Sequence, residues 1–492
     1  MAVLEEARPA ASRTQPAGLL RSRVAILAAF ALYAGLLAFV IPHHEAWFDE
    51  GQAWLIARDS NLGNLFSRLA YEGQPGLWHL ILMVPAKTLP YSAINWISGA
   101  FGALGVYVFL TRSPFPTPVK VLVPFTFFLF YQYAVVARNY VLIPVVLFAI
   151  AAMYRRRTEH PVAFAALLFV LANTSTHGFL IAASLAAIEG VELLVRSKNL
   201  GSRPARRELL PLVVLGLGMA AVAFALRPPA DRTFAVAGLH TPGIKEFFVV
   251  VFGMLNNSLA DNKLVLFPFL AAGLWFLRRR RALHLFVVPA GALLIFFAFV
   301  HRAAWHEGVL FLVWVFAFWL ALEKEPAEPA PSDRFSRLAA LSLLAVVCLF
   351  QIYWSFATAK NDVNEPYSGS RDLAHYIKEN DLQDSTIFGV HWSSMAVNPY
   401  FEGNVYANYD APGDVSFWEW SDKNEMVEDY RTIDLLAPDF VVVPVKVPGM
   451  EDPANAQLKH YEQRAVFGGN MYWKTGVLEP DLYILFERKD SP

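Results

Sequence analysis

The sequence predicts a polytopic α-helical membrane protein that carries a small α/β domain at its C-terminal end. Of the 492 residues, 56% are hydrophobic and 17% are charged, which is more apolar surface than a soluble domain of this size can bury. Apolar stretches of roughly membrane-spanning length recur up to about residue 357. Beyond that point Asp, Asn, Glu and Tyr become frequent. We therefore divide the chain into a tail (1–22), a membrane module (23–357) and a C-terminal domain (358–492).

Charge and cysteine content narrow the range of partners. The formal net charge is −1, so nothing in the composition favours a nucleic-acid partner. Cys348 is the only cysteine, which excludes an intramolecular disulfide. Arg13, Arg21 and Arg23 precede the first apolar stretch, and no convincing small-residue cleavage site follows it. This pattern predicts a membrane anchor and not a cleaved signal peptide.

The apolar segments predict about eleven membrane spans, several of them shorter than the roughly 20 residues that cross a bilayer comfortably. They lie near 23–41, 93–110, 118–134, 139–154, 161–174, 178–194, 209–226, 263–277, 284–300, 307–321 and 338–357. A further stretch at 75–90 is short and contains Pro75, Pro85 and Pro90. We found no convincing internal or inverted repeat.

Basic loops set the expected orientation, because positively charged loops stay on the cytoplasmic side. They fall at 155–157, 196–207 and 278–281, with a weaker one at 324–337. All four are cytoplasmic only if the stretch at 75–90 does not cross, so we expect it to be re-entrant or interfacial. The predicted protein then lies in the cytoplasmic (inner) membrane. Its N-terminus is inside, and its first outer loop (42–92) and C-terminal domain are outside.

Local patterns in the last third predict helices and strands in alternation. Ser370 can cap a helix on which Leu373, Ala374 and Ile377 share one face. Between 323 and 336 a Glu, Pro and Ala bias predicts a flexible cytoplasmic linker. Short alternating runs predict strands at 385–390, 440–445 and 482–487. Together these elements indicate a small α/β domain.

With this topology, acidic, basic and amide side chains mix only in the outer loops. These residues are Asp49, Glu50, Glu72, Gln74, Arg138, Asn139, those at 174–177, Asp231, Arg232, His240, Lys245, His301, Arg302 and His306. The inner loops contain mostly Arg and Lys. Arg138, His177 and His306 lie at the ends of apolar segments, where a charge is least costly and can still face a cavity in the bundle.

An amphipathic helix is predicted around the first acidic pair. Trp47, Phe48, Trp54 and Leu55 form one apolar stripe on a helix, and about 100° per residue turns Asp49 away from it. This pattern predicts a helix that lies on the membrane with its acid directed elsewhere.

The residue types at this outer face indicate group transfer from a lipid-linked phosphate. A carboxylate beside a membrane cavity can act as general base toward a hydroxyl or amine acceptor, and Asp49 is our first choice, with Glu50 second or orienting it. Arginine gives bidentate bonds to phosphate, and histidines add further donors. The predicted phosphate-binding residues are Arg138, His301, Arg302 and His306, with His177 supporting them.

Several motifs resemble those of a known family. Residues 48–58 read Phe-Asp-Glu-Gly-Gln-Ala-Trp-Leu-Ile-Ala-Arg, and residues 73–79 read Gly-Gln-Pro-Gly-Leu-Trp-His. Later come Ala-Arg-Asn-Tyr at 137–140, Thr-Ser-Thr-His-Gly at 174–178, and the group around His301 and His306. These motifs resemble the GT-C superfamily of integral membrane glycosyltransferases. The nearest branch is the bacterial one related to protein O-mannosyltransferases and to the lipid A aminoarabinose transferase.

This resemblance covers about residues 20–320 and implies a multi-span bundle with the acidic motif at the catalytic site. It also implies a polyprenyl-phosphate-linked sugar as donor and a glycan, lipid or protein as acceptor. Two positions depart from the pattern. Gly76 stands where a second proline is common, and Asn95 lies where O-mannosyltransferases carry an arginine. The departure at Asn95 argues against the O-mannosyltransferases themselves and points to another bacterial branch.

Simpler roles were weighed for the same residues. Asp49 and Glu50 can belong to a solvated turn or a helix N-cap, Arg138 can snorkel to lipid headgroups, and His177 can be an interhelical histidine. His43, His44 and Glu45 can suggest a metal, but adjacent histidines diverge and no spaced third ligand follows, so we assign none. The aromatic residues of 392–420 can stack on sugars, or can be core or interface anchors.

Two other classes of function compete with an enzyme. A transporter or lipid flippase needs ionisable groups at mid-membrane and broken helices in related halves, and neither is evident. A non-catalytic assembly protein would use its outer domain to recruit a partner. In that case the Asp49→Asn replacement would leave its role intact.

Overall fold

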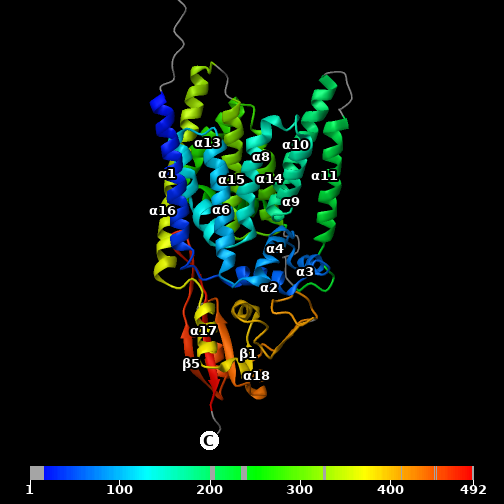
Figure 1. Cartoon of the computed structure of the whole chain (residues 1–492), viewed down its shortest axis with the longest axis vertical. Coiled ribbons are helices and arrows are strands. Elements are labelled where there is room, and N and C mark those ends of the chain that lie inside the picture. Colours follow the sequence, from blue (N-terminus) through cyan, green and yellow to red (C-terminus); the bar gives the residue numbers. More distant parts are fainter. Residues whose placement is uncertain are drawn as a thin grey trace, which may run out of the picture.

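The computed structural model describes residues 16–199, 206–233, 241–324, 328–411, 413–447, 449 and 451–489. A bundle of long helices stands on a smaller domain that contains the strands, and short helices lie between the two (Figure 1). Arg13, Arg203 and His240, which the sequence places in charged or polar loops, lie outside the described residues.

Eight helical segments within the described part are long and apolar enough to cross a membrane. They are α1 (Pro16–Val40, apolar from Ser22), α6 (Ala93–Arg112), α7 to η2 (Thr117–Val135), η3 to η4 through α8 (Asn139–Arg156), α10 (Thr176–Asn199), α11 (Arg206–Ala225), η5 with α15 (Ala304–Glu323) and α16 (Pro331–Asn364). The prediction of a multi-pass membrane protein is thereby confirmed.

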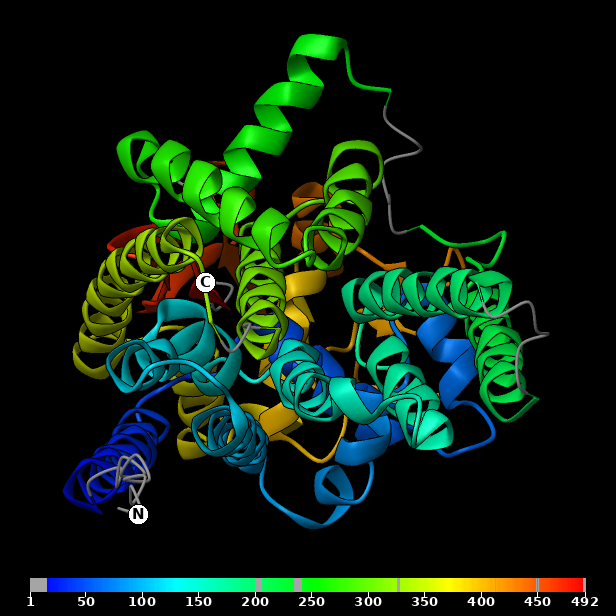
Figure 2. The ribbon, with the colours of Figure 1, turned by 90° about the horizontal axis from the view of Figure 1, so that it is seen from above.

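Three predicted spans have a different form. The segment at 263–277 lies in α13 (Lys263–Arg279), which is bent by 91° against α12 (Ile244–Leu259), a helix that the sequence patterns did not predict. The segments at 161–174 and 284–300 form α9 (Pro161–Ala172) and α14 (His284–Phe299), of 12 and 16 residues. The count of about eleven spans therefore stays a prediction. Within the bundle, α15 (Glu307–Glu323) is buried along nearly its whole length, whereas α1 stands at the edge (Figure 2).

The first outer loop forms a layer of short helices under the bundle. These are α2 (Phe48–Asp59), α3 (Leu65–Glu72), α4 (Leu77–Leu82) and α5 (Pro85–Thr88) (Figure 1). Helices α4 and α5, of 6 and 4 residues, are too short to cross a hydrocarbon core of about 30 Å. This form agrees with the prediction that 75–90 does not cross the membrane, and the position of the segment relative to the lipid stays a prediction.

The apolar stripe of α2 faces protein. Phe48, Trp54 and Leu55 are at most 3% exposed, and the Phe48 ring meets Trp392 of the C-terminal domain at a centroid distance of 4.4 Å. The expectation that this helix lies on lipid is therefore wrong. The periodicity identified the buried face of the helix correctly, but the C-terminal domain and the bundle cover it.

Basic loops gather at the opposite end of the bundle. Arg157 pairs with Glu189 and Glu192, and His284 lies 3.4 Å from Glu192. Lys324 donates to the backbone oxygen of Arg281 at 3.2 Å. Arg196 also pairs with Glu189, at 2.8 Å, so the described parts of all four predicted cytoplasmic loops meet at one end, away from α2, as the topology requires. The side of the membrane on which this end lies stays a prediction.

The C-terminal domain contains a four-stranded mixed sheet in the order β1 (Ile387–Gly389), β4 (Phe440–Val445), β8 (Leu482–Arg488), β5 (Tyr461–Phe467). Strands β1 and β4 are parallel and the other pairs antiparallel, so the three strands predicted from sequence are neighbours. Helix α17 (Ser370–Glu379) buries Leu373, Ala374 and Ile377 completely, as predicted. The remaining elements are β2 (Tyr409–Asp410), β3 (Glu425–Met426), α18 (Tyr430–Leu436), α19 (Glu451–Gln457), β6 (Asn470–Trp473) and β7 (Gly476–Pro480).

Two boundary predictions were wrong. Ser370 is the first helical residue of α17, with Gly369 as the cap, and its hydroxyl bonds that of Ser368 at 2.9 Å. The predicted linker at 323–336 becomes helical at Pro331, because proline fits the first position of a helix. From there α16 runs unbroken to Asn364, so the C-terminal domain begins near residue 365 and not at 358.

The hairpin of β6 and β7 fastens this domain to the bundle. Lys474, at its turn, places Nζ 3.1 Å from the backbone oxygen of Asn257 and 3.4 Å from Glu307 Oε2. The same ammonium lies 4.4 Å from the ring centroid of Trp354 on α16. A buried ion pair of this kind sets the position of the domain relative to the bundle.

Candidate active site

Asp49 lies in the first turn of α2, where the bundle meets the C-terminal domain. Its Oδ2 is 2.7 Å from Nη2 of Arg138, and the two side chains are 28% and 15% exposed. Burial raises the pKa of the Asp49 carboxyl, while Arg138 acts in the opposite direction. The predicted base and the predicted phosphate-binding arginine are therefore in direct contact.

The Arg138 guanidinium is surrounded by aromatic rings and keeps one donor unused. Its carbon lies 5.5, 5.2 and 4.8 Å from the ring centroids of Trp47, Tyr140 and Trp305. Its Nη1 is buried and has no hydrogen-bond partner among the described residues. An arginine held by rings on its faces and by a carboxylate at one nitrogen can offer the other nitrogen to an anion.

Glu50 points into the protein, although it is the next residue after Asp49. It is fully buried, and its carboxylate accepts hydrogen bonds from Ala137 N at 2.6 Å and Trp47 N at 3.1 Å. Asn95 Nδ2 and His44 Nε2 each lie 3.2 Å away. Four partners occupy this carboxylate, which favours the orienting role that the sequence patterns left open for it. Asn95, one of the two positions that depart from the motif pattern, thus contacts the acidic pair directly.

Residues 49–50 and 137–138 make two adjacent contacts, which join the first outer loop to the loop before α8 (Leu142–Met153). Asp49 binds the side chain of Arg138, and Glu50 binds the backbone N–H of Ala137. Successive helical residues point about 100° apart, so one acid faces the surface and the other the core. Glu50 thereby fixes the backbone that carries Arg138.

His44 links Glu50 to α16, the last long helix. Its Nδ1 lies 2.9 Å from Asp362 on α16, and Tyr131 donates to the same carboxylate at 2.9 Å. Burial opposes a charged imidazole here, but Asp362 and Glu50 raise the pKa of His44 well above 6.5. His44 is therefore a buried cation between two carboxylates. Its role is structural, and Glu45 has separate partners in Arg371 and Tyr367 N.

Glu72 is a second carboxylate near Asp49, at the end of α3. Gln52 Nε2, from α2, donates to it at 2.8 Å. Burial raises the pKa of Glu72 to about 7, and the Asp49 charge adds to the rise, whereas Gln52 and Arg232 oppose it. A carboxyl group with a pKa near neutrality is well suited to exchange protons in catalysis.

Three of the predicted histidines converge behind Arg138. The ring centroids of His177 and His306 are 4.3 Å apart, and His301 lies 5.3 Å from His306. His306 Nδ1 faces the backbone N–H of Ala303 at 3.0 Å and so must be unprotonated. His177 is buried, and neither ring nitrogen has a hydrogen-bond partner among the described residues. Its ring instead packs against Tyr140, Phe296 and Phe297, at centroid distances of 5.5 to 5.7 Å.

The remaining predicted residues lie in an exposed loop. Arg302 and His301 lie in the loop before η5 (Ala304–His306). Arg302 is exposed, whereas the protein partly covers the imidazole of His301, and this partial burial together with the Arg138 charge lowers the pKa of His301. Among the described residues, no group of three or more His, Cys, Asp and Glu side chains is arranged to hold a metal ion.

An aromatic wall from the C-terminal domain borders the carboxylates. It consists of Trp392, Trp418 and Trp420. The ring centroid of Trp420 lies 5.5 Å from that of Trp392 and 6.1 Å from that of Trp418. Gln52 holds this wall in place, because its amide accepts from Trp418 N at 3.0 Å and donates to Trp418 O at 2.6 Å. The site is therefore shared between the first outer loop and the C-terminal domain.

Comparison of the sequence with models of known protein families gives no match, and comparison with curated proteins gives none either. The resemblance to the GT-C superfamily therefore rests on the motifs alone.

Sequence reasoning placed Glu72 in an outer loop but did not assign it to the site, and it overlooked Gln52. A signal for Glu72 was present, since it directly precedes the Gly-Gln-Pro motif at 73–75. Gln52 bonds a backbone 366 residues away, and no local pattern announces such a pair.

Proposed function

We propose that the protein is a membrane glycosyltransferase. It transfers a sugar from a polyprenyl-phosphate-linked donor to an acceptor at the end of the bundle that carries the C-terminal domain. The observation that carries this proposal is the pair of Asp49 and Arg138. An acid with a raised pKa touches a cation that still has a buried, unpaired N–H. General base and phosphate ligand are the two functions that such a transfer needs at one place.

In the proposed reaction, Asp49 accepts a proton from the attacking hydroxyl of the acceptor. The acceptor oxygen forms a bond to the anomeric carbon while the bond from that carbon to the phosphate oxygen breaks. The electron pair of the broken bond leaves with the polyprenyl phosphate. Arg138 and His301 donate to the phosphate, which gains one negative charge in this step. Arg302 and His306 remain candidates for the same role, with His177 supporting them.

Glu72 contributes through its titration. Burial raises its pKa to about 7, and the charge of Asp49 adds to the rise, so Glu72 can take the proton onward from the site. Glu50 and His44 contribute by position only, since they fix the backbone beside Arg138 and connect it to α16.

The test is transfer by the purified protein in lipid nanodiscs. A panel of polyprenyl-phosphate sugars is offered with the wild type, Asp49→Asn and the matched control Asp410→Asn, which changes an exposed aspartate of the outer domain. We expect transfer by the wild type and the control. Loss of the base should reduce the rate of Asp49→Asn by about 10²- to 10⁴-fold.

Wild-type transfer rates in the folded Asp49→Asn protein would overturn the role of Asp49. Movement of a labelled polyprenyl-phosphate sugar across the bilayer, with no transfer by the wild type, would instead identify a flippase.

A further inference from the structure

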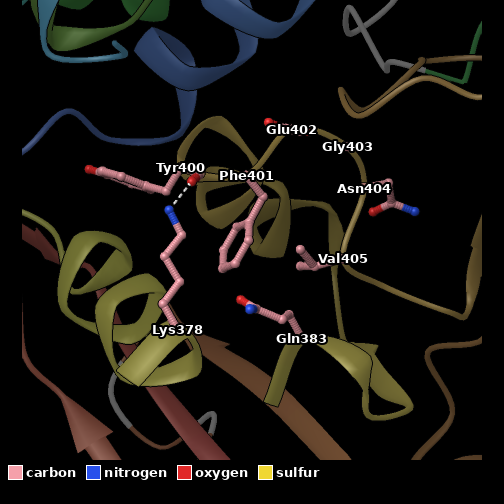
Figure 3. Close-up of a pocket in the computed structure, with 8 residues that line it drawn as sticks. All are labelled: Lys378, Gln383, Tyr400, Phe401, Glu402, Gly403, Asn404 and Val405. Carbon is pink, nitrogen blue, oxygen red and sulfur yellow. Dashed lines mark hydrogen bonds between the residues drawn. The ribbon is translucent and has the colours of Figure 1, made fainter. Parts of the chain in front are cut away.

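A cavity of about 430 Å³ opens in the C-terminal domain, outside the site described above. It lies between the end of α17, η6 (Leu382–Asp384) and the segment that follows η7 (Trp392–Tyr400). Figure 3 shows that Phe401, Gln383 and Val405 point into one common space, with Lys378 at its edge. Small-molecule sites usually have volumes of about 300 to 1,000 Å³, so the cavity has the size of a ligand site.

The lining favours a neutral, polyhydroxylated ligand. Lys378 and Glu402 balance each other in formal charge, and Lys378 Nζ is already bonded to the backbone oxygen of Tyr400. No excess of positive charge remains for a phosphate or an acidic polymer. The Phe401 ring borders the cavity, with Lys378 Nζ 4.9 Å from its centroid, and Gln383 adds an exposed amide. A ring that packs on C–H groups and an amide that bonds hydroxyls are the two contacts that a sugar residue needs.

A hydrogen bond connects the rim of this cavity to α2, the helix that carries Asp49. Arg58, in the last turn of α2, donates through Nη1 to the backbone oxygen of Phe401 at 2.6 Å. Asp49 lies in the first turn of the same 12-residue helix. At about 1.5 Å per residue this helix is about 18 Å long, so one hexose cannot touch both ends of it, but an oligosaccharide can.

We infer that the cavity binds neutral sugar residues of an oligosaccharide acceptor whose reacting end lies at Asp49. This inference rests on the proposed function and names its acceptor class as a glycan and not a protein or a lipid. The cavity is then a distal subsite that holds the acceptor.

Transfer kinetics with acceptors of different length test the inference. Full-length protein in nanodiscs is given a hexose disaccharide or the corresponding pentasaccharide, with Gln383→Ala, Phe401→Ala and the control Gln463→Ala, an exposed glutamine of β5. We expect the two cavity variants to raise the KM for the pentasaccharide about tenfold. Their kcat, and all constants for the disaccharide, should stay unchanged. Equal effects on both acceptors, or none, would overturn the subsite.

Direct binding separates this inference from the proposed function. Saturation-transfer NMR with cellopentaose, maltopentaose and chitopentaose should detect binding of at least one probe to wild type and to Asp49→Asn, and weaker binding to Gln383→Ala. Binding without any transfer would refute the enzyme but keep the glycan site. Transfer that is insensitive to Gln383→Ala, with no probe bound, would refute the glycan site but keep the enzyme. Gln383 is exposed, so its replacement leaves the fold intact even if Phe401→Ala does not.

Discussion

Replacement of Glu72 by glutamine should stabilise the folded protein at neutral and alkaline pH. The change keeps the shape of the side chain and removes its titration. In the folded protein the pKa of Glu72 is about 7, raised mainly by burial from an ordinary value of 4.5. The folded state therefore holds the proton more tightly than the unfolded state. This contribution to stability is complete below pH 4.5 and is lost as the pH rises through 7.

The size of the effect follows from that difference. A change from 4.5 to about 7 corresponds to about 3 kcal/mol in the free energy of unfolding above pH 7, and this is an upper figure because Glu72 is only partly buried. The glutamine variant has no carboxyl group to ionise and therefore does not lose this free energy of unfolding. Its stability relative to the wild type should rise by up to about 3 kcal/mol between pH 4.5 and 8.

Denaturant unfolding of both proteins in the same detergent, at several pH values from 4.5 to 8, measures this difference. Glu379→Gln, an exposed glutamate of α17, is the matched control and should show no such pH-dependent difference. Parallel stability curves for wild type and Glu72→Gln would refute the reasoning, because they would mean that Glu72 is ionised without cost in the folded protein.

Four further outcomes are expected. Arg138→Lys should lower kcat by about 10-fold or more while the fold is kept, because lysine retains the charge and loses the second donor; normal kcat would contradict this. Glu50→Ala should destabilise the protein by about 3 kcal/mol in denaturant unfolding, since it removes one of the two carboxylates beside the buried His44 cation and leaves the backbone N–H groups of Trp47 and Ala137 without their acceptor; an unchanged midpoint would contradict it. Lys474→Met should make the C-terminal domain more sensitive to limited proteolysis than the wild type, and equal cleavage rates would show that the hairpin contact is dispensable. If Glu72 must be ionised for turnover, kcat/KM should fall as the pH drops below about 7, and Glu72→Gln should lose that limb of the profile.

Elements with a local signature were predictable from the sequence. The buried face of α17 follows from helical periodicity, and β4, an apolar run that is buried at every residue, has the bounds predicted from the sequence. The meeting of Asp49 with Arg138 was also predictable, because the positive loops fix which segment ends share a side. Topology alone thus places these chemically complementary residues at the same end of the bundle.

Contacts between distant segments were not predictable in this way. His44 binds Asp362, 318 residues later, and no sequence pattern indicates that the first outer loop is bonded to the last long helix. The stripe on α2 shows the same limit, since periodicity identifies a buried face but not whether lipid or protein covers it. At Pro331 two interpretations of one residue compete, because proline marks both linkers and the first turns of helices.

The unbroken helix α16 makes the site sensitive to the thickness of the bilayer. Its 34 residues extend over about 51 Å, whereas the hydrocarbon core measures about 30 Å, so a substantial part projects beyond the lipid. Asp362, near its end, is bonded to His44 and thus to the loop that holds Asp49. A helix adapts to a thinner or thicker membrane by tilting. We therefore expect a tilt of α16 to displace Asp362 and, through His44, the carboxylates of the candidate site, so that lipid chain length would affect its geometry.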